Sequence, residues 1–373
     1  MLKYIACYSD YQKFEEFLQF LLRILNFSFI PKNLLKGYQK LIFPIFELYA
    51  LTSAVFTIMY YEKDLIILIV KIMQIMGLLQ LLTKSLSVLV NTEQLNILFQ
   101  FIQEAYKIHQ VHYVTESAKI HLKRSLSIIK IITGILFTAA FGAGGGVIFY
   151  FIYIDSMLLA VPGVFLTPSS NLFYQHIHQF FVLQLSAILL MIPDTVLISI
   201  GFYFIAILNI FKDILRYIDN VDSTNKRQFL LQIHKLHCNI LDKFCIFSEV
   251  FYYTFTVQIA TSVVFMMFIF FILQTEGGLA FLPLLLAIFG QFGAACIFGE
   301  LIYSKTEKLS TELYLTNWYE LDLEEQKILL MMLYMTQKTF GLKAAGMYDI
   351  NIEMFIEVIK AGISCLAILY TLA

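Results

Sequence analysis

The chain has 373 residues, of which 59% are hydrophobic and 14% charged, with a formal net charge of -1. Its mean hydropathy is +0.76 and its pI about 6.7. A soluble domain is about half apolar and about a quarter charged, so this composition excludes an ordinary soluble protein and predicts one membrane-embedded bundle. A near-neutral charge without a basic face also argues against nucleic acid as a partner.

Long apolar runs predict an all-α membrane protein with seven transmembrane helices. A helix needs about 20 mainly apolar residues to cross the hydrocarbon core, and only helices or closed barrels satisfy the backbone there. The predicted spans are roughly 40–61, 65–90, 125–154, 178–208, 248–273, 279–303 and 350–372. A further amphipathic stretch, 321–340, predicts a cytosolic helix that leads into the last span.

The positions of lysine and arginine predict the orientation, because short loops rich in these residues stay in the cytosol. Of the 26 basic residues, 21 lie in 1–40, 91–124, 209–247 and 304–343, whereas the opposite loops contain only Lys63. We therefore expect a cytosolic N-terminus, without a signal peptide, and an extracellular C-terminus. This orientation excludes a G-protein-coupled receptor, which starts outside.

Asp194 follows Pro193 near the middle of the fourth predicted span. An ionised carboxylate there costs several kcal/mol unless it is paired or hydrated, so we expect it to face the bundle interior. It is either a ligand or gating contact or, as we favour, a structural anchor bonded to backbone groups that the proline frees. The glycine-rich run 142–146 lacks the spacing of a phosphate loop and predicts close helix packing or room for a ligand.

Two further patterns do not predict catalysis or a bound metal. His234, His237, Cys238 and Cys245 match no standard zinc spacing and fit an amphipathic cytosolic helix better. No nucleophile and base occur in a recognisable order. We expect no enzyme activity and no cofactor.

Lys360 is an unusual charge within the last predicted span. Residues 360, 364, 368 and 371 share one helix face, which is therefore partly polar. This face lines an aqueous path, or Lys360 pairs with Glu357 one turn earlier and serves packing. The spacing leaves both interpretations open.

The C-terminal part contains a specific series of motifs, and in their order they resemble the C-terminal end of the insect odorant receptors, which are seven-span ligand-gated cation channels. The motifs are Gln291-Phe292, Cys296, Gly299-Glu300, Tyr314, Trp318-Tyr319, Gln337-Lys338, Ala345-Gly346 and the final helix Asn351 to Leu372. The similarity is best over 284–373, and Gln184 followed by Asp194-Thr195 adds a weaker match.

This resemblance implies a tetramer with one central pore lined by the last span of each subunit. It implies Ile368 as a hydrophobic gate, beside Thr371 and Leu372, on the face of Lys360 and Ser364. It also implies a pocket in the outer half of the bundle for a small neutral volatile. The pocket residues would be Ile69, Met73, Phe137, Phe141, Gly144, Gln184, Ala187, Ile188, Met191, Leu284 and Ile288.

The same resemblance implies a division of labour within the chain and with partners. Residues 1–303 would form the ligand-binding bundle, and 304–373 a cytosolic anchor helix with the pore span. The loop 209–247 lacks the long insertion of the family's co-receptor, so we expect a tuning subunit that joins co-receptor subunits in a heterotetramer. It would reside in the lipid of the plasma membrane, in the dendrite of a sensory neuron. Lys360 replaces a small residue of the co-receptor, and we hypothesise that it reduces calcium permeation.

Two other functions compete with this prediction. Gustatory receptors form homomeric channels, but their last span typically contains Thr-Tyr and then Gln-Phe pairs, which are missing here. A transporter should contain inverted repeats or paired broken helices, and the sequence has no such internal symmetry.

Overall fold

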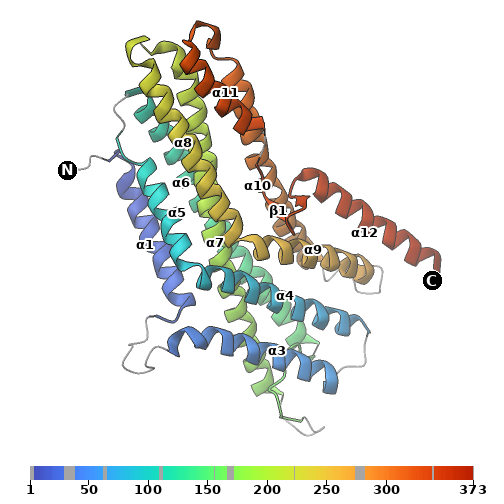
Figure 1. Ribbon diagram of the computed structural model, residues 1–373. Helices are drawn as coiled ribbons and strands as arrows, with labels where there is room; N and C mark the ends of the chain where they lie inside the picture. Colours follow the sequence, from blue (N-terminus) through green and yellow to red (C-terminus); the bar gives the residue numbers. More distant parts are fainter. Residues whose placement is uncertain are drawn as a thin grey trace.

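The computed structural model of the chain is almost entirely helical (Figure 1). It describes residues 4–28, 38–61, 65–108, 112–154, 156–165, 172–221, 223–273, 282–337 and 340–372. The helices are α1 (Tyr8–Leu25), α3 (Ile42–Tyr61), α4 (Leu65–Val90), α5 (Thr92–Ala105), α6 (His112–Tyr153), α7 (Phe173–Tyr217), α8 (Ser223–Val250), α9 (Tyr252–Leu273), α10 (Leu282–Tyr314), α11 (Leu323–Gln337) and α12 (Ile352–Leu372). One hairpin pairs β1 (Lys343–Ala344) with β2 (Tyr348–Asp349) before the last helix.

Each of the seven predicted spans contains a helix, namely α3, α4, α6, α7, α9, α10 and α12. Within the described residues, five helical stretches are long and apolar enough to cross a membrane: Ile42–Tyr60, Leu65–Val90, Tyr113–Tyr153, Phe173–Asn220 and Tyr252–Leu273. The count of seven crossings and the orientation remain predictions. The fifth span starts at Tyr252, later than the predicted 248, because α8 continues to Val250.

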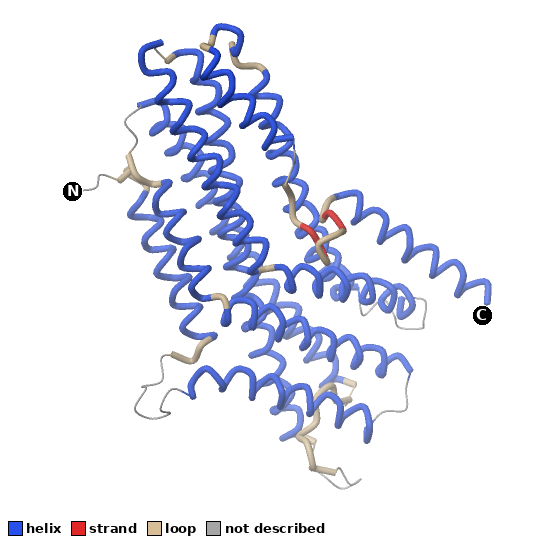
Figure 2. Tube along the Cα trace, viewed as in Figure 1, coloured by secondary structure: helices blue, strands red, loops and turns tan. Residues whose placement is uncertain are grey.

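Helices α6 and α7 are much longer than a membrane requires. They contain 42 and 45 residues, or roughly 60 Å at 1.5 Å per residue, about twice the hydrocarbon thickness. The two helices pack along each other, and their far ends join α8, α10 and α11 in a second bundle at the top of Figure 2. Helix α11 lies within the predicted stretch 321–340, but the expectation of an amphipathic helix was wrong, because Leu330, Met331 and Tyr334 are exposed.

Pro193 lies inside α7 without ending it. Proline removes one backbone donor, and nearby hydroxyls commonly compensate within membrane helices. Here the Thr195 hydroxyl donates to the Met191 carbonyl at 2.8 Å, and the Ser199 hydroxyl donates to the Thr195 carbonyl at 2.6 Å. Both bonds lie beyond the Leu189 carbonyl that Pro193 leaves without its helical donor, and α7 continues through the proline.

The N-terminal segment forms helix α1, which our sequence analysis did not predict. Its buried residues recur at helical spacing and include Tyr11, Phe14 and Leu18. The Tyr11 ring stacks on Tyr106 with centroids 4.7 Å apart, and the Tyr106 hydroxyl donates to the Tyr203 hydroxyl at 3.1 Å. Burial raises the pKa of both Tyr11 and Tyr106, so these hydroxyls stay neutral. The Tyr11 ring and the Tyr106 hydroxyl hold α1 and the end of α5 against Tyr203 of α7.

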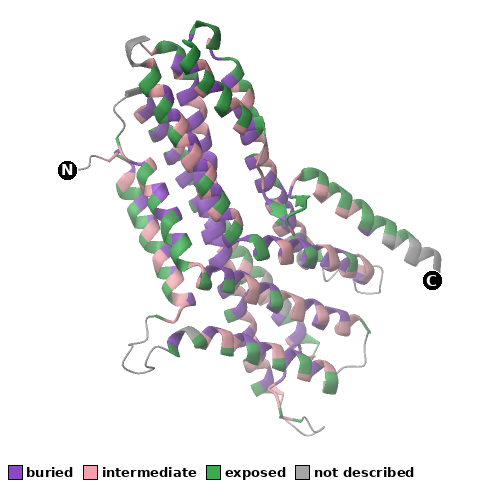
Figure 3. Ribbon diagram, viewed as in Figure 1, coloured by how far each residue is buried: buried purple, intermediate pink, exposed green. Residues whose placement is uncertain are grey.

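Buried residues concentrate between α6, α7 and α8, whereas α12 exposes much of its surface (Figure 3). Helix α12 contacts α9 and α10 closely at glycines. A Cβ atom on Gly362 would lie 2.7 Å from the Phe270 ring, and one on Gly293 would lie 3.4 Å from Phe355. One face of α12 is thus packed, and the opposite face is exposed among the described residues.

Candidate functional site

The predicted pocket region contains one close contact between α6 and α7. A Cβ atom on Gly144 would lie 3.4 Å from Gln184 Oε1 and 3.6 Å from the Ala187 side chain. The Gln184 Nε2 atom is shielded from solvent and has no hydrogen-bond partner in the described part of the chain. An unpaired amide donor in an apolar environment costs about 1–3 kcal/mol, so Gln184 Nε2 is an unsatisfied donor at this contact.

The other predicted pocket residues differ in their burial. Ile69, Met73 and Ile288 are buried in the main apolar core, and Phe137 packs against that core. Three positions, Gly144, Gln184 and Ala187, are in direct contact. The half-buried positions are Phe137, Gly144, Gln184, Ala187, Ile188 and Met191, whereas Phe141 is exposed and the side chain of Leu284 lies outside the described residues.

Asp194 forms an ion pair with Lys84 of α4. The Lys84 Nζ atom donates to both carboxylate oxygens, at 2.7 and 2.9 Å, and the two side chains are 0% and 10% exposed. Our expectation that Asp194 bonds to backbone groups freed by Pro193 was wrong, because both of its carboxylate oxygens accept hydrogen bonds from Lys84. The Lys84–Asp194 ion pair instead joins α4 to α7, one turn along α7 from Met191.

Sequence reasoning missed Lys84 as the partner of Asp194. A signal was available, since a buried carboxylate in a span requires a nearby cation and few lysines occur within spans. The two residues are 110 positions apart, however, and helix packing alone decides which lysine reaches the carboxylate.

An aromatic cluster connects the Ile288 region to the last helix. Phe289, next to Ile288 on α10, meets the Phe355 ring edge-to-face at 6.2 Å and the Phe270 ring at 5.9 Å. Phe292, one turn along, lies 5.4 Å from Phe355. A shift of α10 at the candidate pocket would therefore press directly on α12.

The polar face of α12 is exposed in this chain. Lys360 and Ser364 are both exposed, and the Ser364 hydroxyl donates to the Lys360 carbonyl at 2.8 Å. Lys360 makes no ion pair with Glu357 or any other described carboxylate. Ile368, Thr371 and Leu372 belong to α12 by their backbone, but their side chains lie outside the described residues.

Within the described residues, the histidines of α8 do not form a group of ligands that could hold a metal ion. His237 is buried and its ring stacks on Phe211 at 5.3 Å. Both ring nitrogens lack a hydrogen-bond partner among the described residues. Burial, followed by the neighbouring His234, lowers the pKa of His237 to about 4, so the ring is neutral at pH 7.

These features together define the class: a helical integral membrane protein with long apolar helices, a buried intramembrane ion pair and a last helix with one unpacked polar face. The sequence model described as "7tm Odorant receptor" matches residues 66–362. Because the match covers most of the sequence, the chain belongs to the odorant receptor family.

Solved structures of the insect olfactory receptor OR5 from Machilis hrabei have the same fold. One is 14% identical with a TM-score of 0.77, and one in complex with eugenol is 13% identical with a TM-score of 0.79. In each case the alignment covers 99% of this chain and 100% of the other. The comparison with curated proteins gives no match.

Proposed function

We propose that this chain is the odorant-binding subunit of an odorant-gated, non-selective cation channel that assembles with co-receptor subunits. The observation that carries this proposal is the odorant receptor family match, which extends from α4 to α12 and so includes the helices of the candidate pocket. One relative of the same fold has been solved in complex with eugenol, a small volatile phenol.

The proposed ligand is a small neutral volatile that binds between α4, α6, α7 and α10. Apolar side chains such as Met73 and Ile288 would select it by shape and dispersion. Gln184 would supply a hydrogen-bond donor to an oxygen of the ligand.

Opening would pass from α10 to α12. A ligand beside Ile288 changes the position of α10, and Phe289 and Phe292 transmit the change through their contacts with Phe355. The last helices of four subunits would then separate at Ile368, where a hydrophobic constriction blocks ions by dewetting.

Whole-cell current recorded during a panel of volatiles tests this function. We expect ligand-evoked cation current when the chain is expressed with the co-receptor and none when either is expressed alone. Strong current from this chain alone would contradict the tuning-subunit assignment and favour a homomeric channel, as predicted for a gustatory receptor. Substrate flux without an ionic current would instead favour a transporter.

A further inference from the structure

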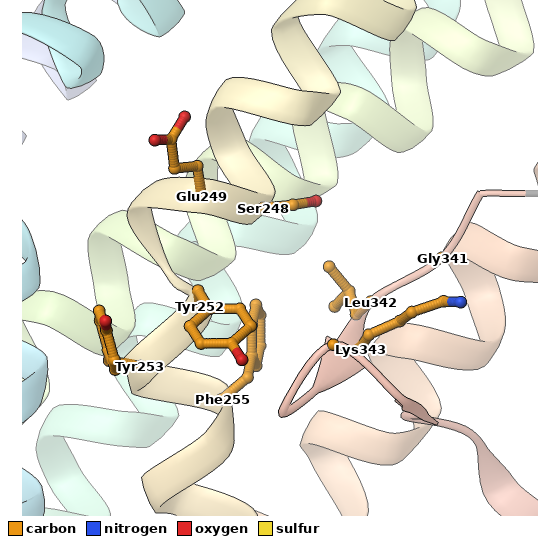
Figure 4. A pocket seen from close by; sticks show the side chains of 9 residues that line it. Ser248, Glu249, Tyr252, Tyr253, Phe255, Gly341, Leu342 and Lys343 are labelled. Atoms are coloured by element: carbon orange, nitrogen blue, oxygen red, sulfur yellow. The ribbon is translucent and has the colours of Figure 1, made fainter.

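A cavity of about 520 Å³ lies between the α8–α9 junction and the segment that precedes α12 (Figure 4). The end of α8 contributes Ser248, the start of α9 contributes Tyr252 and Phe255, and the opposite wall contains Leu342 and Lys343. None of the candidate odorant residues lines this cavity. Its volume is in the range of small-molecule sites.

One wall of the cavity belongs to the β1–β2 hairpin, which is docked on α9. The turn places Ala345 and Gly346 at φ of 51° and 70°, a left-handed conformation that is unfavourable for alanine. The Ala345 N–H donates to Thr256 Oγ1 at 2.9 Å, and a Cβ atom on Gly346 would lie 3.7 Å from the Tyr252 ring. These contacts hold the strained turn against α9.

The hairpin leads directly into the last helix. The Ile350 N–H donates to the Leu342 carbonyl at 2.9 Å, which closes the hairpin two residues before α12 begins at Ile352. On α10, a side chain at Gly299 would overlap the Ile350 carbonyl. A molecule in the cavity therefore touches an element that positions the first turn of α12.

The cavity lining combines one cationic residue, Lys343, one acidic residue, Glu249, and an apolar wall. Lys343 is about half exposed and only loosely paired, with Nζ 3.8 Å from Asp349 Oδ1. The Glu249 carboxylate points away from Leu342 and Lys343 (Figure 4). This chemistry suits an anionic group attached to an apolar tail.

The cavity also lies at one end of an apolar helix. Helix α9 is long and apolar enough to cross a membrane from Tyr252 onward, and Tyr252 and Tyr253 at its start are 37% and 68% exposed. Tyrosines concentrate at membrane–water boundaries. In the orientation predicted from the basic residues, this boundary faces the cytosol, where anionic lipids concentrate.

We propose that this cavity binds the anionic headgroup of a phospholipid from the cytosolic leaflet. Lys343 contacts the anionic headgroup, and Phe255 and Leu342 contact the start of the acyl chains. The bound lipid stabilises the hairpin on α9 and thereby biases the position of α12. The effect on opening rests on the proposed channel function, whereas lipid binding itself does not.

Native mass spectrometry of the purified full-length chain tests the binding, with phosphatidylserine and phosphatidylcholine supplied in equal amounts. We expect about five-fold more retained phosphatidylserine, the preference that one lysine near the surface provides. Lys343→Gln should abolish this preference, so that the two lipids are retained equally, and Lys343→Arg should keep it. Lys235→Gln is the matched control, because Lys235 is exposed on α8 outside the cavity.

Three outcomes would overturn the proposal. Equal retention of the two lipids would remove the anionic preference, and equal losses in Lys343→Gln and Lys235→Gln would indicate general surface attraction. Displacement of the lipid by micromolar glycerophosphoserine would indicate a site for soluble anions. Because this measurement needs neither odorant nor current, its failure is distinguishable from failure of the odorant-gated channel.

Discussion

At the residue scale, the Lys84–Asp194 ion pair places two opposite charges inside the apolar bundle. Lys84 is fully buried and each Asp194 oxygen accepts one of its hydrogen bonds. A buried pair often contributes little relative to apolar residues of similar size, but loss of one partner leaves a costly unpaired charge. The pair therefore stabilises the α4–α7 contact only while both charged side chains are present.

Single substitutions of this pair should destabilise the protein more than the double substitution. Lys84→Met or Asp194→Leu alone should cost about 3–5 kcal/mol and reduce surface expression. The Lys84→Met, Asp194→Leu double variant should recover most of the lost stability, because no charge remains unpaired. Thermal unfolding and surface labelling provide the measurement. Additive losses in the double variant would show that the two side chains act independently.

Gln184 provides a test of ligand chemistry. Gln184→Leu keeps the side-chain size but removes the shielded Nε2 donor. A neutral hydrogen bond contributes about 0.5–1.5 kcal/mol, so potency should fall about three- to ten-fold for an oxygen-containing ligand. A hydrocarbon analogue of the same shape serves as the control and should keep its potency in dose–response currents. Equal changes for both ligands would mean that Gln184 has a packing role only.

At the element scale, the contact between α10 and α12 connects the candidate pocket to the pore helix. Phe355 lies against both Phe289 and Phe292. Phe355→Leu should weaken this contact by about 1 kcal/mol and raise the odorant concentration for half-maximal current about five-fold. Ile356→Leu, at a 45% exposed neighbour on α12, is the control. An equal shift of the half-maximal odorant concentration in both variants would show that the aromatic rings have no special role in this coupling.

The α7–α8 contact predicts a pH dependence of stability. His237 has a folded-state pKa near 4, lowered mainly by burial, whereas unfolded histidine titrates near 6.5. Between these values the unfolded state binds more protons, so stability falls as pH decreases below about 6.5 and the loss reaches about 2 kcal/mol at pH 5. His237→Leu should reduce the drop in melting temperature between pH 7 and pH 5. An unchanged drop in this variant would assign the pH dependence to other groups.

At the scale of the whole molecule, the polar face of α12 that contains Lys360 and Ser364 is exposed. Within one chain Lys360 has no carboxylate partner among the described residues. In a tetramer with α12 around a central pore, it would contribute a positive charge to the inner pore and repel divalent cations more than monovalent ones.

Lys360→Ala should therefore raise the relative calcium permeability of the assembled channel, by roughly two- to three-fold for loss of a screened pore charge. Reversal potentials in calcium and sodium solutions measure this ratio. Ile363→Ala, at another exposed position of α12, controls for changes in helix packing. Unchanged permeability would place Lys360 outside the ion path.

The sequence by itself determined where the long apolar helices lie and which family the C-terminal motifs resemble. Apolar length is a property of contiguous residues, so α3, α4, α6, α7, α9, α10 and α12 could be found by hydropathy. One motif has a local physical reason, because Ala345-Gly346 forms the hairpin turn.

Only the tertiary structure decided which distant residues meet. It paired Lys84 with Asp194, docked Ala345 on Thr256 and packed α1 against α7. It also left Phe141 of α6 exposed, whereas Gly144 of the same helix contacts Gln184 of α7. The physical reason is that such contacts depend on how helices cross and on which faces they present to each other. Hydropathy along the sequence contains no information about the crossing or about the facing surfaces.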